Sequence, residues 1–303
     1  MITVIFIRWG KSVKHALYEN CLFFLCLCCD AVAARADATY FIVDSALVYD
    51  SNIGRAQRSI DIDDDFALEA GLTAARSFRL DDKSGLVVRA GAQVRQQFRF
   101  QDLNRFSLEA GVNYRIQPVV GFTNPWIELA LDVARLEHRD SRIRDGWISN
   151  AGIGVGKYFT DRIRATAGWN YEVRNAEQGR VFDWRHNTLN LATDYRFTEN
   201  STLYVKASRI YGDQVSTVGF PYSASGNYGD VAKAVAPDTA LEDNTEHRAY
   251  RIDAITNVFE IGMNYAVKGD LALDSSLQHY YSSADGGNTY NATGARAGLL
   301  YRF

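Results

Sequence analysis

Apolar and polar side chains alternate with a period of two through most of the chain after residue 36. In residues 66–80, Phe66, Leu68 and Leu72 fall on one face, while Glu69 falls on the other. A period of two is the pattern of a β-strand, because the 3.6-residue period of a helix would mix these residues around its surface. The alternation therefore predicts a chain built almost entirely of strands.

The predicted strands are long, and the connections between them alternate between short and long. Their length of about 12 to 15 residues exceeds the usual five or six, and a tilted membrane-spanning strand needs about 9 to 11. Bacterial outer-membrane barrels show the same alternation of turns and loops. The pattern predicts an all-β fold, a transmembrane antiparallel up-and-down β-barrel of about 12 strands over residues 37–303, with a long extracellular loop at 212–249. We place the strands at 39–51, 66–80, 86–100, 105–117, 126–138, 147–159, 162–174, 185–197, 202–211, 250–267, 271–282 and 290–303.

The first 36 residues have the composition of a cleaved secretory signal peptide. Arg8, Lys11 and Lys14 form a basic segment, residues 21–29 form a short apolar core, and residues 34–36 read Ala-Arg-Ala. This order of basic, apolar and small residues is what a signal peptidase requires. We therefore predict a signal peptide at 1–36 and export of the rest to the outer membrane.

Cysteine usage and charge exclude several classes of function for the mature chain. The four cysteines all lie within the predicted signal peptide, so neither a disulfide framework nor a thiolate metal site is expected. Without the leader, 29 basic and 34 acidic residues remain, which is no electrostatic footprint for nucleic acid. We expect no cofactor: Gly152, Gly154 and Gly156 lie within a predicted strand, where no helix follows to bind a phosphate. These glycines are expected to make room for long side chains that cross the lumen, or to let the wall bend.

The last strand carries a family resemblance. Apolar residues occupy every second position back from the end, at Leu299, Tyr301 and Phe303. This resembles the C-terminal strand of Gram-negative outer-membrane barrel proteins, which the barrel-assembly machinery reads as a signal. Residues 49–53, Tyr-Asp-Ser-Asn-Ile, resemble a motif in several porin-like barrel families. The resemblance implies an outer-membrane location, with membrane lipids, lipopolysaccharide and the assembly machinery as partners. It leaves the oligomeric state unknown.

Enzymatic and metal-binding readings find little support in the sequence. His138 is followed by Asp140 and Ser141, but it lacks the close His-x-Ser spacing of the barrel lipid hydrolases, so we expect no enzyme. The acidic run at 61–65 lacks the glycine and the final acid of an EF-hand. We expect no metal site, although a solvated loop and a divalent bridge to lipopolysaccharide phosphates both remain open for this run.

Charged residues dominate the face that is predicted to point inwards. A barrel of 12 strands lies between the filled barrels of eight and the open porins of sixteen, so a salt-bridged interior and a narrow pore with a slight preference for anions both remain open. The predicted inward bases are Arg79, Arg89, Arg95, Arg99, Arg105, Arg115, Arg164, Arg174, Arg196, Lys206, Arg296 and Arg302. The predicted inward acids are Asp44, Glu69, Glu109, Glu128, Asp132, Glu172, Asp194, Glu260 and Asp274.

A lumen charge cluster is the sharpest site prediction. The turn at 81–85 is expected to place Gln97 opposite Glu69, and the loop at 101–104 to place Arg95 opposite Glu109. Arg95 would then lie between the two carboxylates and narrow the lumen. The full predicted cluster comprises Arg95, Glu69, Glu109, Arg89, Glu128 and Asp132.

These observations favour a narrow outer-membrane pore for small solutes. The alternative is a non-conducting structural or surface-binding barrel with a scaffold, adhesion or assembly role. A barrel lipid hydrolase is the third and weakest reading.

Overall fold

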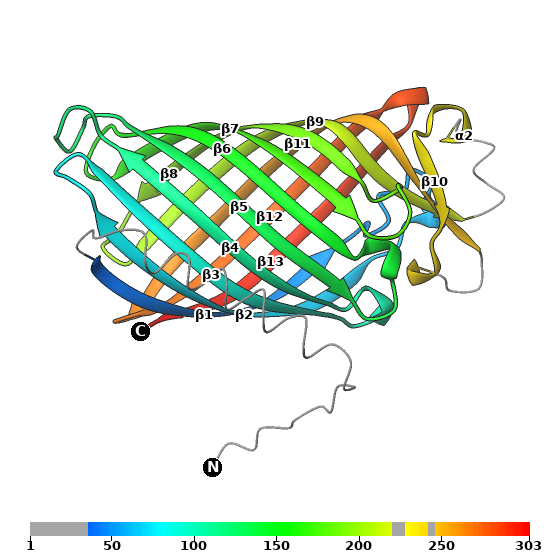
Figure 1. The fold of residues 1–303 in the computed structure, drawn as a ribbon, viewed down its shortest axis with the longest axis horizontal. Helices are drawn as coiled ribbons and strands as arrows, with labels where there is room; N and C mark the ends of the chain where they lie inside the picture. Colours follow the sequence, from blue (N-terminus) through cyan, green and yellow to red (C-terminus); the bar gives the residue numbers. More distant parts are fainter. Residues whose placement is uncertain (1–35, 220–227, 242–245) are drawn as a thin grey trace, which may run out of the picture. The chain divides into compact units, whose positions relative to one another are not determined.

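The structure, a computed structural model, describes residues 36–219, 228–241 and 246–303. The predicted signal peptide therefore lies outside the described residues, apart from Ala36, where the first strand begins. The described chain forms one antiparallel sheet that closes on itself, because β1 pairs with both β2 and β13 (Figure 1). Each strand otherwise pairs with its neighbours in sequence order, apart from the short β10. The predicted up-and-down β-barrel is confirmed.

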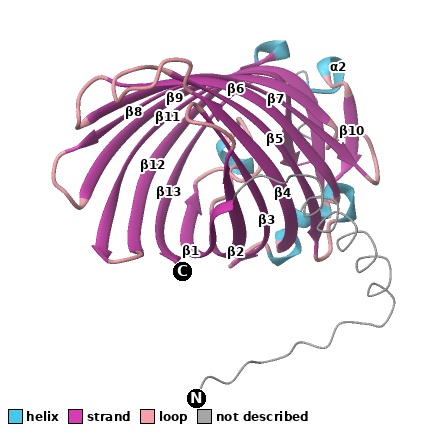
Figure 2. Cartoon of the chain, turned by 60° about the vertical axis from the view of Figure 1, so that its left-hand side comes forward, coloured by secondary structure: helices cyan, strands magenta, loops and turns pink. Residues whose placement is uncertain are grey.

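The strands have the lengths that membrane-spanning strands need. No helix in the described residues is long and apolar enough to cross a membrane, and the helical turns are confined to the connections (Figure 2). The strands are β1 (Ala36–Asp50), β2 (Asp65–Arg79), β3 (Ser84–Gln97), β4 (Arg105–Ile116), β5 (Trp126–His138), β6 (Gly146–Tyr158), β7 (Ile163–Ala176), β8 (Trp184–Arg196), β9 (Ser201–Gly219), β10 (Ala234–Pro237), β11 (His247–Lys268), β12 (Leu271–Ala284) and β13 (Thr289–Arg302). The helical elements are η1 (Ser59–Asp61), η2 (Gln101–Leu103), η3 (Arg142–Arg144), α2 (Tyr228–Val231), η5 (Thr239–Leu241) and η6 (Asp285–Gly287).

The two ends of the barrel differ in their connections. One end, called here the short-turn end, carries the turns at 80–83, 117–125, 159–162, 197–200 and 269–270. The opposite end, called the long-loop end, carries every helical turn of the described residues and the connections at 51–64, 98–104, 139–145, 177–183, 220–246 and 285–288. Apart from the nine-residue connection at 117–125 and the four-residue one at 285–288, this is the alternation of short and long connections that the sequence predicts.

The structure corrects the extent of the longest loop. The predicted loop at 212–249 is shorter, because β9 continues to Gly219 and β11 begins at His247. These extensions pair with each other, with Thr217 opposite Ala249. Gly212 marks the bend where the extension leaves β8, with φ 132°, a value that glycine adopts without strain. The polar residues after Gly212 resemble a loop in sequence, but a pairing partner 28 to 40 residues away extends the hairpin.

The outer wall carries a belt of exposed apolar side chains. Phe41, Leu68, Leu131, Leu191 and Leu277 are all more than 40% exposed, as expected for a surface that faces lipid rather than water. Aromatic side chains end this belt at the short-turn end, where Phe159, Phe197, Tyr265, Tyr301 and Phe303 are exposed.

Two tryptophans lie on the inner face instead of in this aromatic belt. Trp126 is buried, and a Cβ added at Gly156 on the next strand would collide with its ring. Trp184 donates to the carboxylate of Glu172 at 2.9 Å. Both side chains therefore lie on the inner face, as the period of two in their strands requires.

Candidate functional site: the charged lumen and its capped end

The strand register brings the inward-facing residues of neighbouring strands together. Glu69 is opposite Arg95 on β3, and Arg95 is opposite Arg105 on β4. The bases and acids that the sequence places inwards lie on this face of their strands, opposite the apolar belt. Arg99 is the exception, because it lies beyond the end of β3 and pairs with Asp63 in the loop at 51–64.

The predicted cluster around Arg95 has different partners in the structure. Arg95 contacts Glu69 at 3.1 Å, and Arg296 of β13 contacts the other oxygen of the same carboxylate at 3.6 Å. Glu109 lies opposite Gly91 and makes no hydrogen bond or ion pair with any described residue. Glu69 therefore joins two arginines, instead of Arg95 joining two carboxylates.

The expected register was wrong at both ends of β3. Glu69 lies opposite Arg95 and not Gln97, and Arg95 lies opposite Arg105 and not Glu109. The errors are two and four residues, which preserve the face of each side chain but change its partner. Alternation specifies the face, whereas the conformation of the turn at 80–83 and of the loop at 98–104 sets the register.

A second group of lumen charges lies on β3, β4 and β5. Arg89 forms an ion pair with Asp132 and a hydrogen bond with Asn113. Asn113 also donates to Glu128 at 3.1 Å, and Arg115 donates to the other oxygen of Glu128 at 2.8 Å. The predicted cluster thus divides into two groups: Glu69 with Arg95, and Arg89 with Asp132 and Glu128.

Glycines on the inner face make room for side chains from the next strand. A Cβ at Gly111 would collide with the Asp132 carboxylate, and one at Gly152 would collide with the amide of Asn170. Gly262 receives the ring of Tyr204 in the same way. These side chains lie flat along the wall, so they take up less of the lumen than side chains directed at the barrel axis would.

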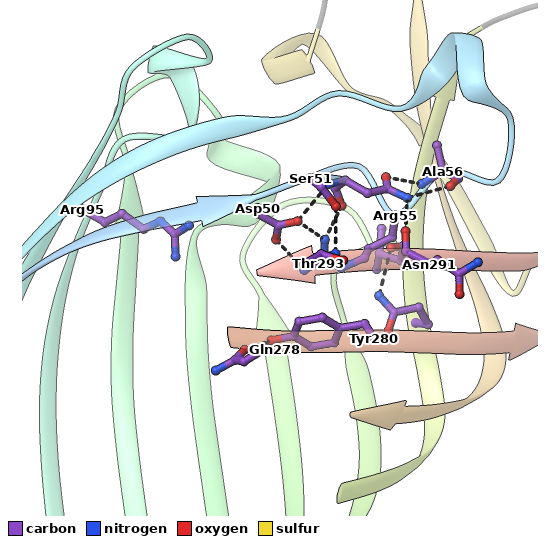
Figure 3. A network of polar contacts seen from close by, with 12 residues as sticks. Asp50, Ser51, Arg55, Ala56, Arg95, Gln278, Tyr280, Asn291 and Thr293 are labelled. Atoms are coloured by element: carbon purple, nitrogen blue, oxygen red, sulfur yellow. Dashed lines mark hydrogen bonds and ion pairs between the residues drawn. The ribbon is translucent and has the colours of Figure 1, made fainter. Parts of the chain in front are cut away.

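The loop at 51–64 returns into the barrel mouth through a polar network (Figure 3). Arg55 donates to both oxygens of Asp50 at 2.7 Å, and its guanidinium lies 5.1 Å from the centre of the Tyr280 ring. Asn52 fixes the loop by donating to the carbonyls of Ala56 and Asn291 at 2.8 and 3.0 Å. Arg55 has a φ of 53°, which costs energy for a residue with a Cβ and is retained only where surrounding contacts hold it.

The connections at the long-loop end pack together into a cap. We define the cap as residues 51–61, 139–145, 177–183 and 228–241 with the extended parts of the hairpin, 212–219 and 247–254. The 51–61 segment bonds to the free edge of β9, where Thr217 donates its backbone N–H to the Gly54 carbonyl at 2.8 Å. Two apolar clusters lie in the cap. Ala56, Val218, Tyr228, Tyr250, Ile252 and Ala254 form one together with Ala284 at the end of β12, and Val181, Phe182 and Ala249 form the other.

A buried ion pair joins three parts of the cap. Arg144 donates to both carboxylate oxygens of Asp238 at 2.5 Å, and Thr217 donates to the same carboxylate at 2.9 Å. Asp238 is fully buried. Burial alone would raise the pKa of Asp238, but the Arg144 guanidinium and the hydrogen bonds from Thr217 and Ala240 hold this pKa below its usual value. The carboxylate is therefore ionised in the closed cap.

A polar recess opens in the lumen away from the cap. Its volume is about 350 Å³, and its lining includes Arg164, Asp194, Lys206, Glu260 and Asp274. Arg164 contacts Asp194 at 2.7 Å, and Lys206 contacts Glu260 at 3.4 Å. Of the two other charged residues in the lining, Asp274 accepts from the hydroxyl of Tyr204 at 3.2 Å, and Arg296 contacts Glu69 at 3.6 Å.

The residues considered for catalysis and metal binding have structural partners. His138 contacts Asp145 at 3.3 Å, while the hydroxyl of Ser141 accepts from Arg144 at 2.8 Å, so these two do not form a nucleophile and base. In the acidic run, Asp65 accepts the backbone N–H groups of Arg99 and Phe100. Among the described residues, no group of three or more His, Cys, Asp or Glu side chains is arranged to hold a metal ion.

The C-terminal residues that resemble an assembly signal lie on the outer wall. Phe303 forms backbone hydrogen bonds with Phe41 in both directions, at 2.8 and 3.0 Å, and the two rings stack at 5.7 Å. Tyr301 packs against Phe303, and Leu299 is exposed in the apolar belt. The strand thus closes the barrel while it presents its apolar face outwards.

Sequence patterns missed the residues that organise the cap. Arg55, Arg144 and Asp238 lie in loops, where no period distinguishes a buried side chain from a solvated one. The segment at 49–53 contained a signal, because it includes Asp50, which binds Arg55 (Figure 3), and Asn52, which donates to the carbonyl of Ala56.

Comparison with known proteins places the fold. No protein-family model matches the chain, and no curated protein matches it. Among solved structures, it is similar to the COG4313 outer membrane channel from Pseudomonas putida F1, with a TM-score of 0.55 and 10% identity over 90% of this chain and 97% of that one. The NanC porin matches with a TM-score of 0.46 and 11% identity over 86% and 98% of the chains. The outer membrane channel DcaP of Acinetobacter baumannii matches with a TM-score of 0.44 and 9% identity over 90% and 99%.

Proposed function

From a fold shared with outer-membrane channels, we propose that the chain is an outer-membrane channel for small solutes, with a charged lumen and a cap that closes its long-loop end. The observation that carries this proposal is the lining of the bore. Charged side chains such as Lys206 and Glu109 are exposed on the inner face, and several neighbours lie flat over glycines. An interior built only as a salt-bridged core would bury such groups in closed networks.

The proposal also includes the location and the orientation of the barrel. A signal peptide at 1–36 directs export, the apolar belt contacts outer-membrane lipids, and the last strand engages the barrel-assembly machinery. The long-loop end faces the outside, where the cap would meet lipopolysaccharide. Cysteines introduced at the exposed positions Asp285 and Lys83 test this orientation: an impermeant maleimide on intact cells should label the first and not the second. The reverse result would invert the barrel.

Conductance of the purified barrel in planar bilayers tests the channel itself. We expect infrequent, discrete openings from the wild-type protein, because the cap covers one end in the closed arrangement. Deletion of residues 228–241 should increase the open time, and liposome swelling with neutral sugars should report the size limit. Silence of both the wild type and the cap deletion, with folding verified by heat-modifiable mobility, would exclude the channel.

A non-conducting, surface-binding barrel is the second candidate, and the packed cap favours it. Ala56, Val181 and Ile252 have no exposed surface, so the cap has a core of its own and could present a fixed surface. This candidate predicts no conductance from the cap deletion and a function that resides in the loops.

A further inference from the structure

Arg105 is an inward-facing arginine that forms no ion pair with any carboxylate of the described residues. It lies near the long-loop end of β4, directly opposite Arg95 on one side and His138 on the other. Like charges opposite each other on paired strands are destabilising unless something compensates them. No ion pair or side-chain hydrogen bond joins Arg105 to a described residue, and its Nε is buried without an acceptor.

The neighbouring groups do not supply the missing negative charge. Glu69 is the nearest carboxylate in this row, but it is already shared by Arg95 and Arg296, at 3.1 and 3.6 Å. The ring of His138 contacts Asp145 at 3.3 Å. The row therefore gathers three guanidinium groups around one carboxylate.

Glu109 is on the same strand but does not compensate Arg105. It faces Gly91 and is exposed in the lumen. A buried donor without an acceptor costs about 1 to 3 kcal/mol, and more when it is charged. The unmatched donor and the excess positive charge both indicate that an anion completes this arrangement.

We propose that Arg95 and Arg105, with the charge of Arg296 beside them, bind the oxyanion group of a small solute, a carboxylate or a phosphate. A guanidinium presents its N–H donors in a fork that matches two oxygens of such a group. The bound anion lies between the two facing arginines and accepts from the Arg105 Nε. The site identifies anions as the class of solute that the proposed channel would take. Anion binding can be measured whether or not the barrel conducts.

The placement of the site fits passage of an anion through the lumen. It lies between the cap and the recess, and Arg296 lines the recess as well. In the recess itself, Arg164 pairs with Asp194 and Lys206 pairs with Glu260. We therefore expect the site to set the anion preference of the channel when the cap is open.

Calorimetry on the folded, full-length barrel tests the site with succinate and inorganic phosphate as probes and glycerol as the neutral control. Arg105→Gln should weaken binding of at least one anion about tenfold or more, since charge-assisted hydrogen bonds are lost. Arg105→Lys keeps the positive charge but lacks the forked donors. Its anion affinity should therefore fall between those of the wild type and Arg105→Gln. Arg79→Gln is the matched control, because Arg79 also faces inwards but pairs with Asp82 at the short-turn end. The affinity of this variant for both anions should stay within about twofold of wild type.

The outcomes separate the site from the channel. Absence of anion binding to a folded wild-type barrel, or equal binding by the wild type and Arg105→Gln, overturns the site even if the barrel conducts. Anion binding that depends on Arg105 in a barrel that never conducts supports the site and removes the channel. A preference for succinate or for phosphate decides the type of oxyanion. If Arg105→Gln does not fold, Arg105→Lys carries the test, and unchanged affinity in that variant overturns the forked geometry.

Discussion

Removing the carboxylate of Asp238 is expected to open the cap. The Asp238 side chain has no exposed surface, and the Arg144 side chain is 10% exposed. In Asp238→Asn, Arg144 loses its negative partner while it remains enclosed by the cap. Breaking a buried ion pair by removal of one partner costs about 3 to 5 kcal/mol, because the remaining charge is uncompensated.

This cost falls on the closed arrangement alone, because an open cap returns Arg144 to water. A cost of about 3 kcal/mol shifts the closed-to-open equilibrium about 150-fold at 25 °C. A cysteine at Ala240, which is 4% exposed in the closed cap, reports this opening without any need for conduction. When opening and closing are fast, the rate of maleimide labelling follows the open population, so Asp238→Asn should raise it by about that factor.

Matched variants make the test specific to the pair. Arg142 is exposed and lies in the same loop as Arg144, so Arg142→Gln should leave the labelling rate nearly unchanged, whereas Arg144→Gln should increase it. The double variant Arg144→Gln with Asp238→Asn should cost less than the sum of the two single changes, because the second change removes a charge that the first left unpaired. An unchanged labelling rate in folded Asp238→Asn would refute the role of the Arg144–Asp238 ion pair in holding the cap closed.

Three further predictions concern pH, the lumen wall and assembly. Arg144 lowers the pKa of Asp238, so the contribution of this carboxylate to cap stability is present above pH about 4 and is lost as the pH falls further through the lowered pKa. The labelling rate at Ala240→Cys should therefore increase in that acidic range, and Asp238→Asn should abolish this pH dependence. Gly111→Ala should displace the Asp132 carboxylate and Arg89 from the wall into the lumen. This should lower the conductance and reduce the free energy of unfolding, measured in urea, by about 1 to 3 kcal/mol. Gly85→Ala is the control, because a Cβ there makes only an ordinary contact at 3.5 Å. Phe303→Ala should reduce the folded fraction on heat-modifiable gels with little effect on conductance per folded barrel, because the ring lies on the outer wall against Phe41; an unchanged folded yield would count against the assembly signal.

The sequence by itself determined the fold class and the face of each strand residue. A period of two assigns side chains such as Glu69, Glu109 and Arg105 to one face, and this assignment depends only on the geometry of a strand. The short and long connections also follow from composition, since polar and glycine-rich stretches interrupt the alternation. The inward direction of Trp126 follows in the same way from its position in β5.

Only the tertiary structure decided which of these residues meet. A register shift of two or four residues leaves every side chain on its face, so no pattern in the sequence distinguishes Glu69 opposite Arg95 from Glu69 opposite Gln97. The cap depends still more on long-range packing, because Arg144 reaches Asp238 across 94 positions of sequence and both lie in segments without periodicity. Burial of that pair, the strained Arg55 and the uncompensated Arg105 result from how loops and strands distant in sequence come together, and local residue patterns carry no record of this.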